Sequence, residues 1–275
     1  MPRVALGISY NGAPWLGWQT QPGGQTVQDQ LETALAQFVG QRIATVCAGR
    51  TDTGVHALKQ VVHLDAPVDR APIAWIRGLN SLLPPSIAVQ WATEVPELFH
   101  ARFSAESRSY SYLILNAPVR QPLWDGRAGW CFRPLNEHAM FEGAQCLIGE
   151  HDFSSFRSSQ CQAASPVRVL HELDVQRSGQ FVIVSLKANA FLHHMVRNIV
   201  GQLILAGQGK TDVLHVKRVL DGRDRTRAAP TFSAAGLYLT DVKYPESLLK
   251  VPLSTSTIHE MVGFSMNFSN LRHDI

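Results

Sequence analysis

The chain has 275 residues, of which 45% are hydrophobic and 17% are charged. These fractions are typical of a folded globular protein and exclude a disordered chain, and the length allows one large domain or two of ordinary size. The formal net charge is +3, a mildly basic balance that permits a nucleic-acid partner without requiring one.

No run of the sequence approaches the roughly 18 apolar residues of a membrane-spanning helix, and no apolar signal segment follows Met1. We therefore expect a soluble, cytoplasmic protein without a membrane partner. The four cysteines include no C-x-x-C pair. Their wide spacing favours buried thiols in a reducing compartment over a zinc site or a disulfide framework.

The sequence pattern of residues 1–105 predicts secondary-structure elements in the order β-α-β-β-α-β. The first strand, Arg3–Tyr10, alternates apolar and polar residues. Thr26, with Asp29 three residues later, resembles a capping box and starts a helix whose apolar residues share one face. The remaining expected elements are strands at 43–47, 60–64 and 87–95 and a helix that begins near Pro72.

The second half predicts the same order of elements. Asn136 is a helix cap, and Ser178-Gly179 indicates a hairpin. The expected strands are 107–115, 167–177, 181–187 and 237–242, and further helices are expected at 192–203 and 213–220. A long connection, 118–134, joins the first strand to the first helix.

We therefore expect an α+β fold made of two similar split β-α-β halves, of ferredoxin-like or RRM-like type, with mostly antiparallel sheets. The expected domains are residues 1–105, which carry the aspartate loop described next, and residues 106–247. Residues 248–275 have no periodicity and are expected to be a poorly ordered tail.

One carboxylate, Asp52, lies in a loop between Gly49 and Gly54, with Arg50 two residues before it and His56 four residues after it. Apolar runs on both sides predict strands that fix the loop while solvent can still reach it. Glycine allows backbone conformations that are closed to other residues. The alternative interpretation is a surface turn whose Asp caps its own backbone.

Two other motifs do not predict a site. Gly209-Lys210-Thr211 resembles the end of a phosphate-binding loop, but Ile204 stands where that motif needs glycine. His193 and His194 lie in a predicted helix, and no carboxylate or third histidine stands at ligand spacing in the sequence. We therefore expect them to pack with polar contacts rather than to bind a metal.

Tyr110 and Tyr112 have the same strand parity, so both point to one face of a sheet. Two such tyrosines are most often part of a core. Beside Arg102 and Arg108, they also fit a platform on which a nucleic-acid base stacks while phosphates bind alongside.

Residues 48–56, Ala-Gly-Arg-Thr-Asp-Thr-Gly-Val-His, resemble the active-site motif of the tRNA pseudouridine synthase A family. Further blocks are similar to that family and follow its order, at 99–105, 108–110, 146–157, 188–201 and 236–239. The resemblance spans about residues 4–244. The residues after His56, Ala-Leu-Lys, depart slightly from the pattern, and the tail has no counterpart.

The resemblance implies conversion of uridine to pseudouridine in the anticodon stem-loop of tRNA, at positions 38, 39 and 40, by a homodimer that needs no metal or organic cofactor. It implies that the sheets of the two halves flank a central basic cleft, which residues 106–247 complete, and that Asp52 is the catalytic nucleophile or base. It also implies that Arg50 holds the carboxylate and helps replace the extruded nucleotide, that Tyr110 stacks on the flipped uracil and is a candidate to assist loss of the C5 proton, and that Leu237 packs near the base. The candidates for contacts with RNA phosphates, or for bracing the aspartate loop, are Arg157, Arg168 and Arg197.

The alternative function is a non-catalytic RNA-binding protein built from two RRM-like halves. The clustered aromatic residues of an RNP1 motif are absent from the sequence. A lone carboxylate in the binding surface would also repel the phosphates of RNA, and a protein that only binds RNA has no need of such a group. A sugar-cleaving hydrolase is a third possibility, but it needs a second carboxylate, and none lies in the Asp52 motif.

Overall fold

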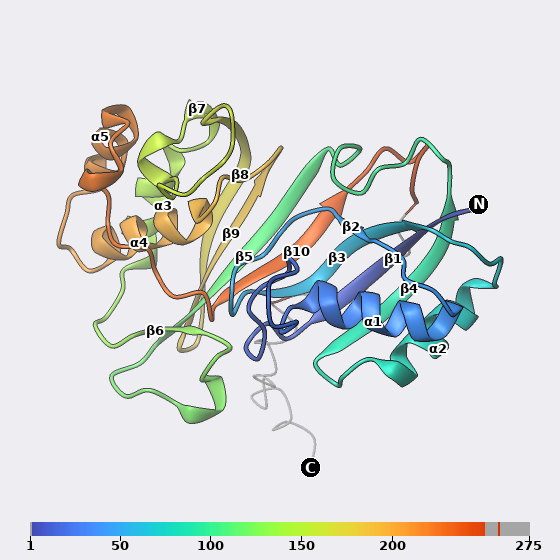
Figure 1. Ribbon diagram of the computed structural model, residues 1–275. Helices are drawn as coiled ribbons and strands as arrows, with labels where there is room; N and C mark the ends of the chain where they lie inside the picture. Colours follow the sequence, from blue (N-terminus) through green and yellow to red (C-terminus); the bar gives the residue numbers. More distant parts are fainter. Residues whose placement is uncertain (1, 251–257, 259–275) are drawn as a thin grey trace, which may run out of the picture.

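The computed structural model describes residues 2–250 and residue 258 (Figure 1). In this part of the chain, ten strands form one mostly antiparallel sheet in the order β4-β1-β3-β10-β5-β9-β8-β7, with β2 paired to β3 and β6 paired to β5. Helices α1 and α2 lie together over the N-terminal strands, and α3, α4 and α5 lie together over the C-terminal strands (Figure 1). The fold is therefore mixed α/β, as expected.

The first half contains the six elements that the sequence predicts. They are β1 (Arg3–Tyr10), α1 (Val27–Val39), β2 (Val46–Cys47), β3 (His56–Asp65), α2 (Pro72–Leu82) and β4 (Ile87–Val95). The side chain of Thr26 accepts a hydrogen bond from the backbone N–H of Asp29, which confirms the predicted cap. Strand β2 is shorter than expected, because the Glu32 carboxylate accepts hydrogen bonds from both the backbone N–H and the hydroxyl of Thr45.

The second half contains the predicted elements and two additional short strands. The elements are β5 (Ser107–Asn116), β6 (Gly129–Cys131), α3 (Glu137–Gln145), β7 (Gly149–Asp152), β8 (Val167–Ser178), β9 (Phe181–Ala188), α4 (Met195–Gly207), α5 (Leu214–Gly222) and β10 (Leu237–Lys243). Asn136 caps α3 through a hydrogen bond from the Ala139 N–H. The sequence did not predict β6 and β7, because three or four residues are too few for an alternating pattern.

The last strand joins the two halves. Strand β10 pairs in parallel with β3 through Tyr238–His56 and Leu239–Ala57, and antiparallel with β5. One continuous sheet therefore runs through both halves, and the division at residue 105 stays a prediction. Apart from residues 248–250 and 258, the expected tail lies outside the described residues.

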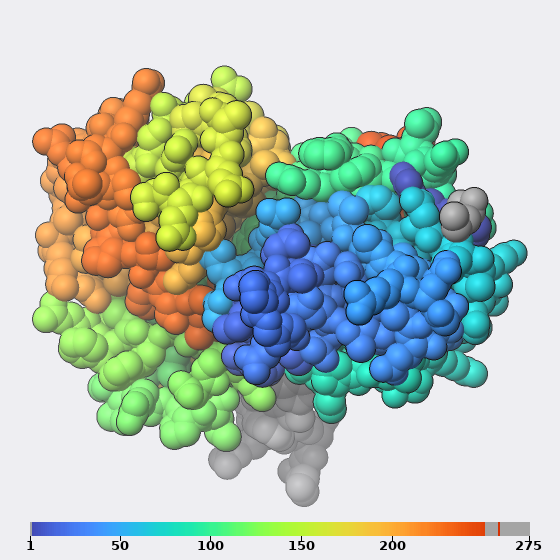
Figure 2. Space-filling view, in the orientation of Figure 1, coloured from blue at the N-terminus to red at the C-terminus, as the bar shows by residue number. Residues whose placement is uncertain are grey.

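The protein has a well-packed core and a surface hollow between its two halves. Large side chains such as Trp18, Trp75 and Phe99 are fully buried, and none of the four cysteines forms a disulfide. Within the described residues, every helix is too short or too polar to cross a bilayer. Figure 2 shows that the surface is hollowed between the C-terminal half, drawn in yellow and orange, and the N-terminal half, drawn in blue.

Candidate active site

The loop between β2 and β3 is held close to the β1–α1 connection. The backbone N–H of Trp18 donates to the Thr51 carbonyl oxygen at 2.9 Å, and the hydroxyls of Tyr10 and Thr51 lie 2.8 Å apart. Gly17 has a φ of +90°, and a Cβ there would stand 2.7 Å from the Thr51 carbonyl oxygen. Only glycine fits this approach. The backbone next to Asp52 is thus fixed, while the carboxylate is 25% exposed.

Three side chains from one distant segment converge on this carboxylate. Nη1 of Arg197 donates to Oδ2 of Asp52 at 3.1 Å. Nε2 of His193 lies 3.1 Å from Oδ1, and Nε2 of His194 lies 3.3 Å from Oδ2. Arg197 is only 16% exposed, and its Nε donates to the Phe232 carbonyl at 2.9 Å. A charge-assisted hydrogen bond in such a partly desolvated position is stronger than one at the surface.

The structure corrects our interpretation of the two histidines. They precede α4 rather than lie within it, because His194 has a φ of 64° that a helix cannot contain. A carboxylate does stand within their reach, which sequence spacing could not show, since it comes from residue 52. One carboxylate oxygen of Asp52 and one ring nitrogen each of His193 and His194 lie within 4.8 Å of one another, a spacing at which these atoms could act as ligands of a divalent metal. Arg197 already places a positive charge on the same carboxylate, so we regard the histidines as polar neighbours of Asp52 rather than as metal ligands.

Tyr110 borders the aspartate loop, whereas Tyr112 belongs to the core. The Tyr110 ring is buried and packs edge-on against Phe191 at 5.0 Å between ring centroids. A Cβ on Gly49 would lie 3.6 Å from the Tyr110 hydroxyl. Burial and, next, the negative charge of Asp52 raise the pKa of Tyr110. The hydroxyl is therefore a neutral phenol at neutral pH.

Arg50 and Leu237 occupy very different surroundings. Arg50 is exposed, and within the described residues its side chain forms no ion pair with Asp52. Arg197 makes the contact that we expected from Arg50, because it reaches the carboxylate from the helix side while Arg50 faces solvent. Leu237 is buried at the start of β10, opposite Tyr112 on β5.

The other two arginines stand apart from the carboxylate. Arg157 is half-buried at the end of the short 3-10 helix Ser154–Phe156. Nη1 of Arg168 donates to the carbonyls of Ser165 and Val167, and burial lowers its pKa. Neither side chain contacts Asp52 among the described residues.

His56, at the end of the motif, has a structural role. Its Nδ1 accepts a hydrogen bond from the Gly12 N–H at 3.0 Å, so its Nε2 carries the proton and donates to the Ala235 carbonyl at 3.0 Å. The ring stacks on Tyr238 with centroids 4.5 Å apart, and burial lowers its pKa. His56 thus ties the end of the aspartate loop to β10.

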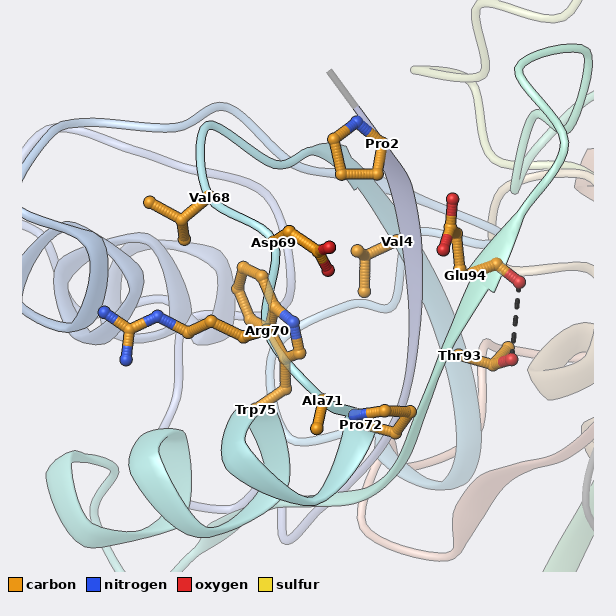
Figure 3. Close-up of a pocket in the computed structure, with 10 residues that line it drawn as sticks. All are labelled: Pro2, Val4, Val68, Asp69, Arg70, Ala71, Pro72, Trp75, Thr93 and Glu94. Atoms are coloured by element: carbon orange, nitrogen blue, oxygen red, sulfur yellow. Dashed lines mark hydrogen bonds between the residues drawn. The ribbon is translucent and has the colours of Figure 1, made fainter.

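A separate pocket lies at the edge of the N-terminal half (Figure 3). Its lining comes from the start of β1, from the segment 68–75 that leads into α2, and from β4, and it includes Val4, Arg70, Trp75 and Glu94. It shares no residue with the surroundings of Asp52, so we do not regard it as part of the site.

Fold and site together define a mixed α/β protein that presents one carboxylate held by an arginine and two histidines. A family model described as tRNA pseudouridine synthase matches residues 8–104 and 144–245. The chain is 62% identical over 247 residues to tRNA pseudouridine synthase A of Bordetella petrii, and the matched region covers 89% of this chain and 92% of that protein. It is 54% identical over 256 residues to tRNA pseudouridine synthase A of Burkholderia multivorans, covering 93% and 95%.

The chain therefore belongs to the tRNA pseudouridine synthase family, which confirms the resemblance found in the sequence. Among solved structures, one described as a Cbf5-Nop10-Gar1 complex is similar at a TM-score of 0.35 and 12% identity, covering 96% of this chain and 56% of that chain. A similarity at that level adds nothing to the assignment.

Proposed function

We propose that the protein isomerises uridine to pseudouridine in the anticodon stem-loop of tRNA, at positions 38, 39 and 40, with Asp52 as the catalytic group. The observation that carries this proposal is the convergence of Arg197 and two histidines on Asp52, from a segment about 145 residues further along the chain. Membership of the tRNA pseudouridine synthase family supports the reaction and the substrate class.

The reaction needs one well-placed carboxylate. The N1–C1′ bond of the uridine breaks, the uracil turns over, and a C5–C1′ bond forms. The C5 proton is lost and N1 gains a proton, so no atom is oxidised and no phosphate is cleaved. Asp52 can act as a nucleophile, or as a base that takes the C2′ proton while positive charge builds at C1′. Both routes need a free carboxylate oxygen near the sugar, and Arg197 holds the other oxygen, Oδ2, at 3.1 Å.

The target base must leave the RNA stack before it can reach Asp52, at a cost of a few kcal/mol. We propose that the Tyr110 ring stacks on the flipped uracil, that Leu237 packs near it, and that the exposed Arg50 fills the space left in the RNA. The position of Tyr110 beneath the loop and the exposure of Arg50 support these roles. Arg157 and Arg168 are our proposed phosphate contacts.

We propose that the hollow between the two halves is the RNA cleft and that the active form is a homodimer. The hollow separates the surfaces of the two halves (Figure 2), and a dimer would double the basic surface of a chain whose net charge is only +3. Four free cysteines suit the reducing cytoplasm, which we propose as the location.

We also propose that each half is a split β-α-β unit, divided near residue 105. The strand order supports this division. In the first half β1 lies between β4 and β3, with β2 on β3, and in the second half β5 lies between β10 and β9, with β8 beyond β9. Counting the four main strands of each half in chain order, both follow the order 4-1-3-2.

A single experiment tests the function against its alternatives. One purified tRNA that carries uridine at these positions is incubated with the protein, and pseudouridine is mapped by its stable carbodiimide adduct. We expect adducts at the anticodon stem-loop uridines. A non-catalytic RNA-binding protein would bind the tRNA and leave every uridine unchanged, and a hydrolase would release free uracil.

A further inference from the structure

The backbone of His194 is unusual. Among the described non-glycine residues, only His194 and Arg223 have a positive φ. The left-handed conformation is unfavourable for a residue with a Cβ, and it persists only where the surroundings fix it. Here the carbonyl of His193 accepts a hydrogen bond from the Ser158 N–H, and the carbonyl of His194 accepts one from the Asn198 N–H, each at 2.9 Å. The turn is thus fixed on both sides.

This conformation directs the His194 ring to Asp52. His194 is the N-cap residue of α4, yet its side chain caps no helical N–H. Instead its Nε2 lies 3.3 Å from Oδ2 of Asp52. The rings of His193 and His194 lie close together, with centroids 3.9 Å apart, and both reach the same carboxylate.

The two oxygens of Asp52 are consequently not equivalent. Oδ2 contacts both Arg197 at 3.1 Å and His194 at 3.3 Å, and these side chains are 16% and 26% exposed. Among the described side chains, Oδ1 is within ion-pair distance only of His193, which is the most exposed of the three at 35%. The better-held oxygen is therefore Oδ2, and the more accessible oxygen is Oδ1.

The charge state of His194 follows from its surroundings. Burial lowers its pKa, and the positive charges of Arg197 and Arg225 and the neighbouring His193 act in the same direction, against the opposing effect of Asp52. The ring is therefore neutral at neutral pH. Within the described residues, Arg197 makes the only side-chain hydrogen bond to Asp52, and the His194 contact is a distance of 3.3 Å without hydrogen-bond alignment. A neutral imidazole can donate to a carboxylate only from the nitrogen that carries its single proton, so donation to Oδ2 requires the Nε2–H tautomer with its N–H turned towards that oxygen.

We propose that His194 is a positioning residue that donates its Nε2–H to Oδ2 of Asp52 and, with Arg197, holds that oxygen so that Oδ1 is the atom presented to the uridine. The proposal rests on the proposed function. It explains why a histidine occupies a left-handed position that glycine would adopt without strain.

The matched variants are His194→Gln and His194→Met. Both keep a Cβ in the left-handed position and have unbranched side chains of similar length, but only glutamine carries an N–H that can reach the position of Nε2. We expect kcat of the glutamine variant to stay within about threefold of wild type and kcat of the methionine variant to fall about tenfold or more. KM for tRNA and the thermal midpoint should be equal in both, because neither the RNA contacts nor the backbone change. Arg223→Gln, at the other left-handed position, is the control for a change distant from the carboxylate.

Equal activity of the two variants would overturn the proposal. So would an equal loss in both together with a lowered thermal midpoint, since that result would assign His194 to the backbone turn alone. A wild-type protein that forms no pseudouridine would instead refute the proposed function.

A measurement that does not depend on turnover tests the contact itself. In the 15N NMR spectrum of histidine-labelled protein near neutral pH, the signals lost in His194→Gln should be those of a neutral ring with its proton on Nε2. A cationic ring, or a proton on Nδ1, would contradict the proposal.

Discussion

Removal of the Arg197 guanidinium tests how the carboxylate is held. In Arg197→Met, Asp52 loses one charge-assisted hydrogen bond of 3.1 Å, and the Phe232 carbonyl loses its bond of 2.9 Å. A hydrogen bond to a charged group contributes about 1.5–3 kcal/mol, and each 1.36 kcal/mol corresponds to about tenfold in rate. If that contribution is expressed in the transition state, kcat/KM falls about 10- to 150-fold.

Tritium release from tRNA labelled at C5 of uridine measures this loss directly, because the C5 hydrogen leaves in each turnover. Arg218→Met is the matched control: Arg218 pairs with Asp212 at 2.8 Å on the exposed surface of α5, where solvent screens an ion pair and it contributes little. We expect the control to keep wild-type activity. If Arg197→Met stays within about threefold of wild type while it remains folded, Arg197 does not hold the catalytic carboxylate.

Three further predictions concern Tyr110, His63 and the assembly. Tyr110→Phe should keep activity within several-fold, because the stacking face survives and the buried phenol is neutral; a loss of about 100-fold would show that the hydroxyl moves a proton. Burial lowers the pKa of His63 from 6.5 to about 4, and its Nδ1 accepts from the Ala101 N–H. As pH falls, the unfolded chain therefore binds the proton first, and stability that is present above pH 6.5 is lost towards pH 4. Between about pH 7.5 and 5, urea unfolding should show a loss of stability that is about 2 kcal/mol smaller in His63→Asn than in wild type, and an equal loss in the variant would refute this assignment. Sedimentation should show a dimer, and tRNA affinity should fall steeply between about 50 and 200 mM salt; a fully active monomer, or an affinity indifferent to salt, would contradict that part of the proposal.

Local sequence signals predicted helices and strands well where each signal reflects a direct physical interaction. Thr26 and Asn136 mark helix starts because each side chain binds a backbone N–H of the first turn. Strand β4 alternates over most of its nine residues between buried and more exposed positions, whereas β1 is buried along nearly its whole length and so does not show the expected alternation. Strands β6 and β7 are too short for such a signal, and their pairing depends on the neighbouring strands β5 and β8.

The site was harder to predict because its contacts join distant residues. The sequence singled out Asp52, since a lone acid between glycines is a local pattern. It could not show that His193 and His194 face that acid, because the contact depends on a left-handed turn before α4. The family resemblance assigned the carboxylate contact to Arg50 and named Arg197 only as one of three candidates for phosphate contacts or for bracing the aspartate loop. In the structure Arg197 makes the contact with Asp52.

The most direct test of the central claim is pseudouridine formation by Asp52→Asn. The carboxamide keeps the volume and can still form hydrogen bonds, but it can neither attack carbon nor accept a proton at neutral pH. We expect a folded variant that binds tRNA with wild-type affinity and makes no pseudouridine. Turnover at even about a hundredth of the wild-type rate would contradict the assignment of Asp52 as nucleophile or base.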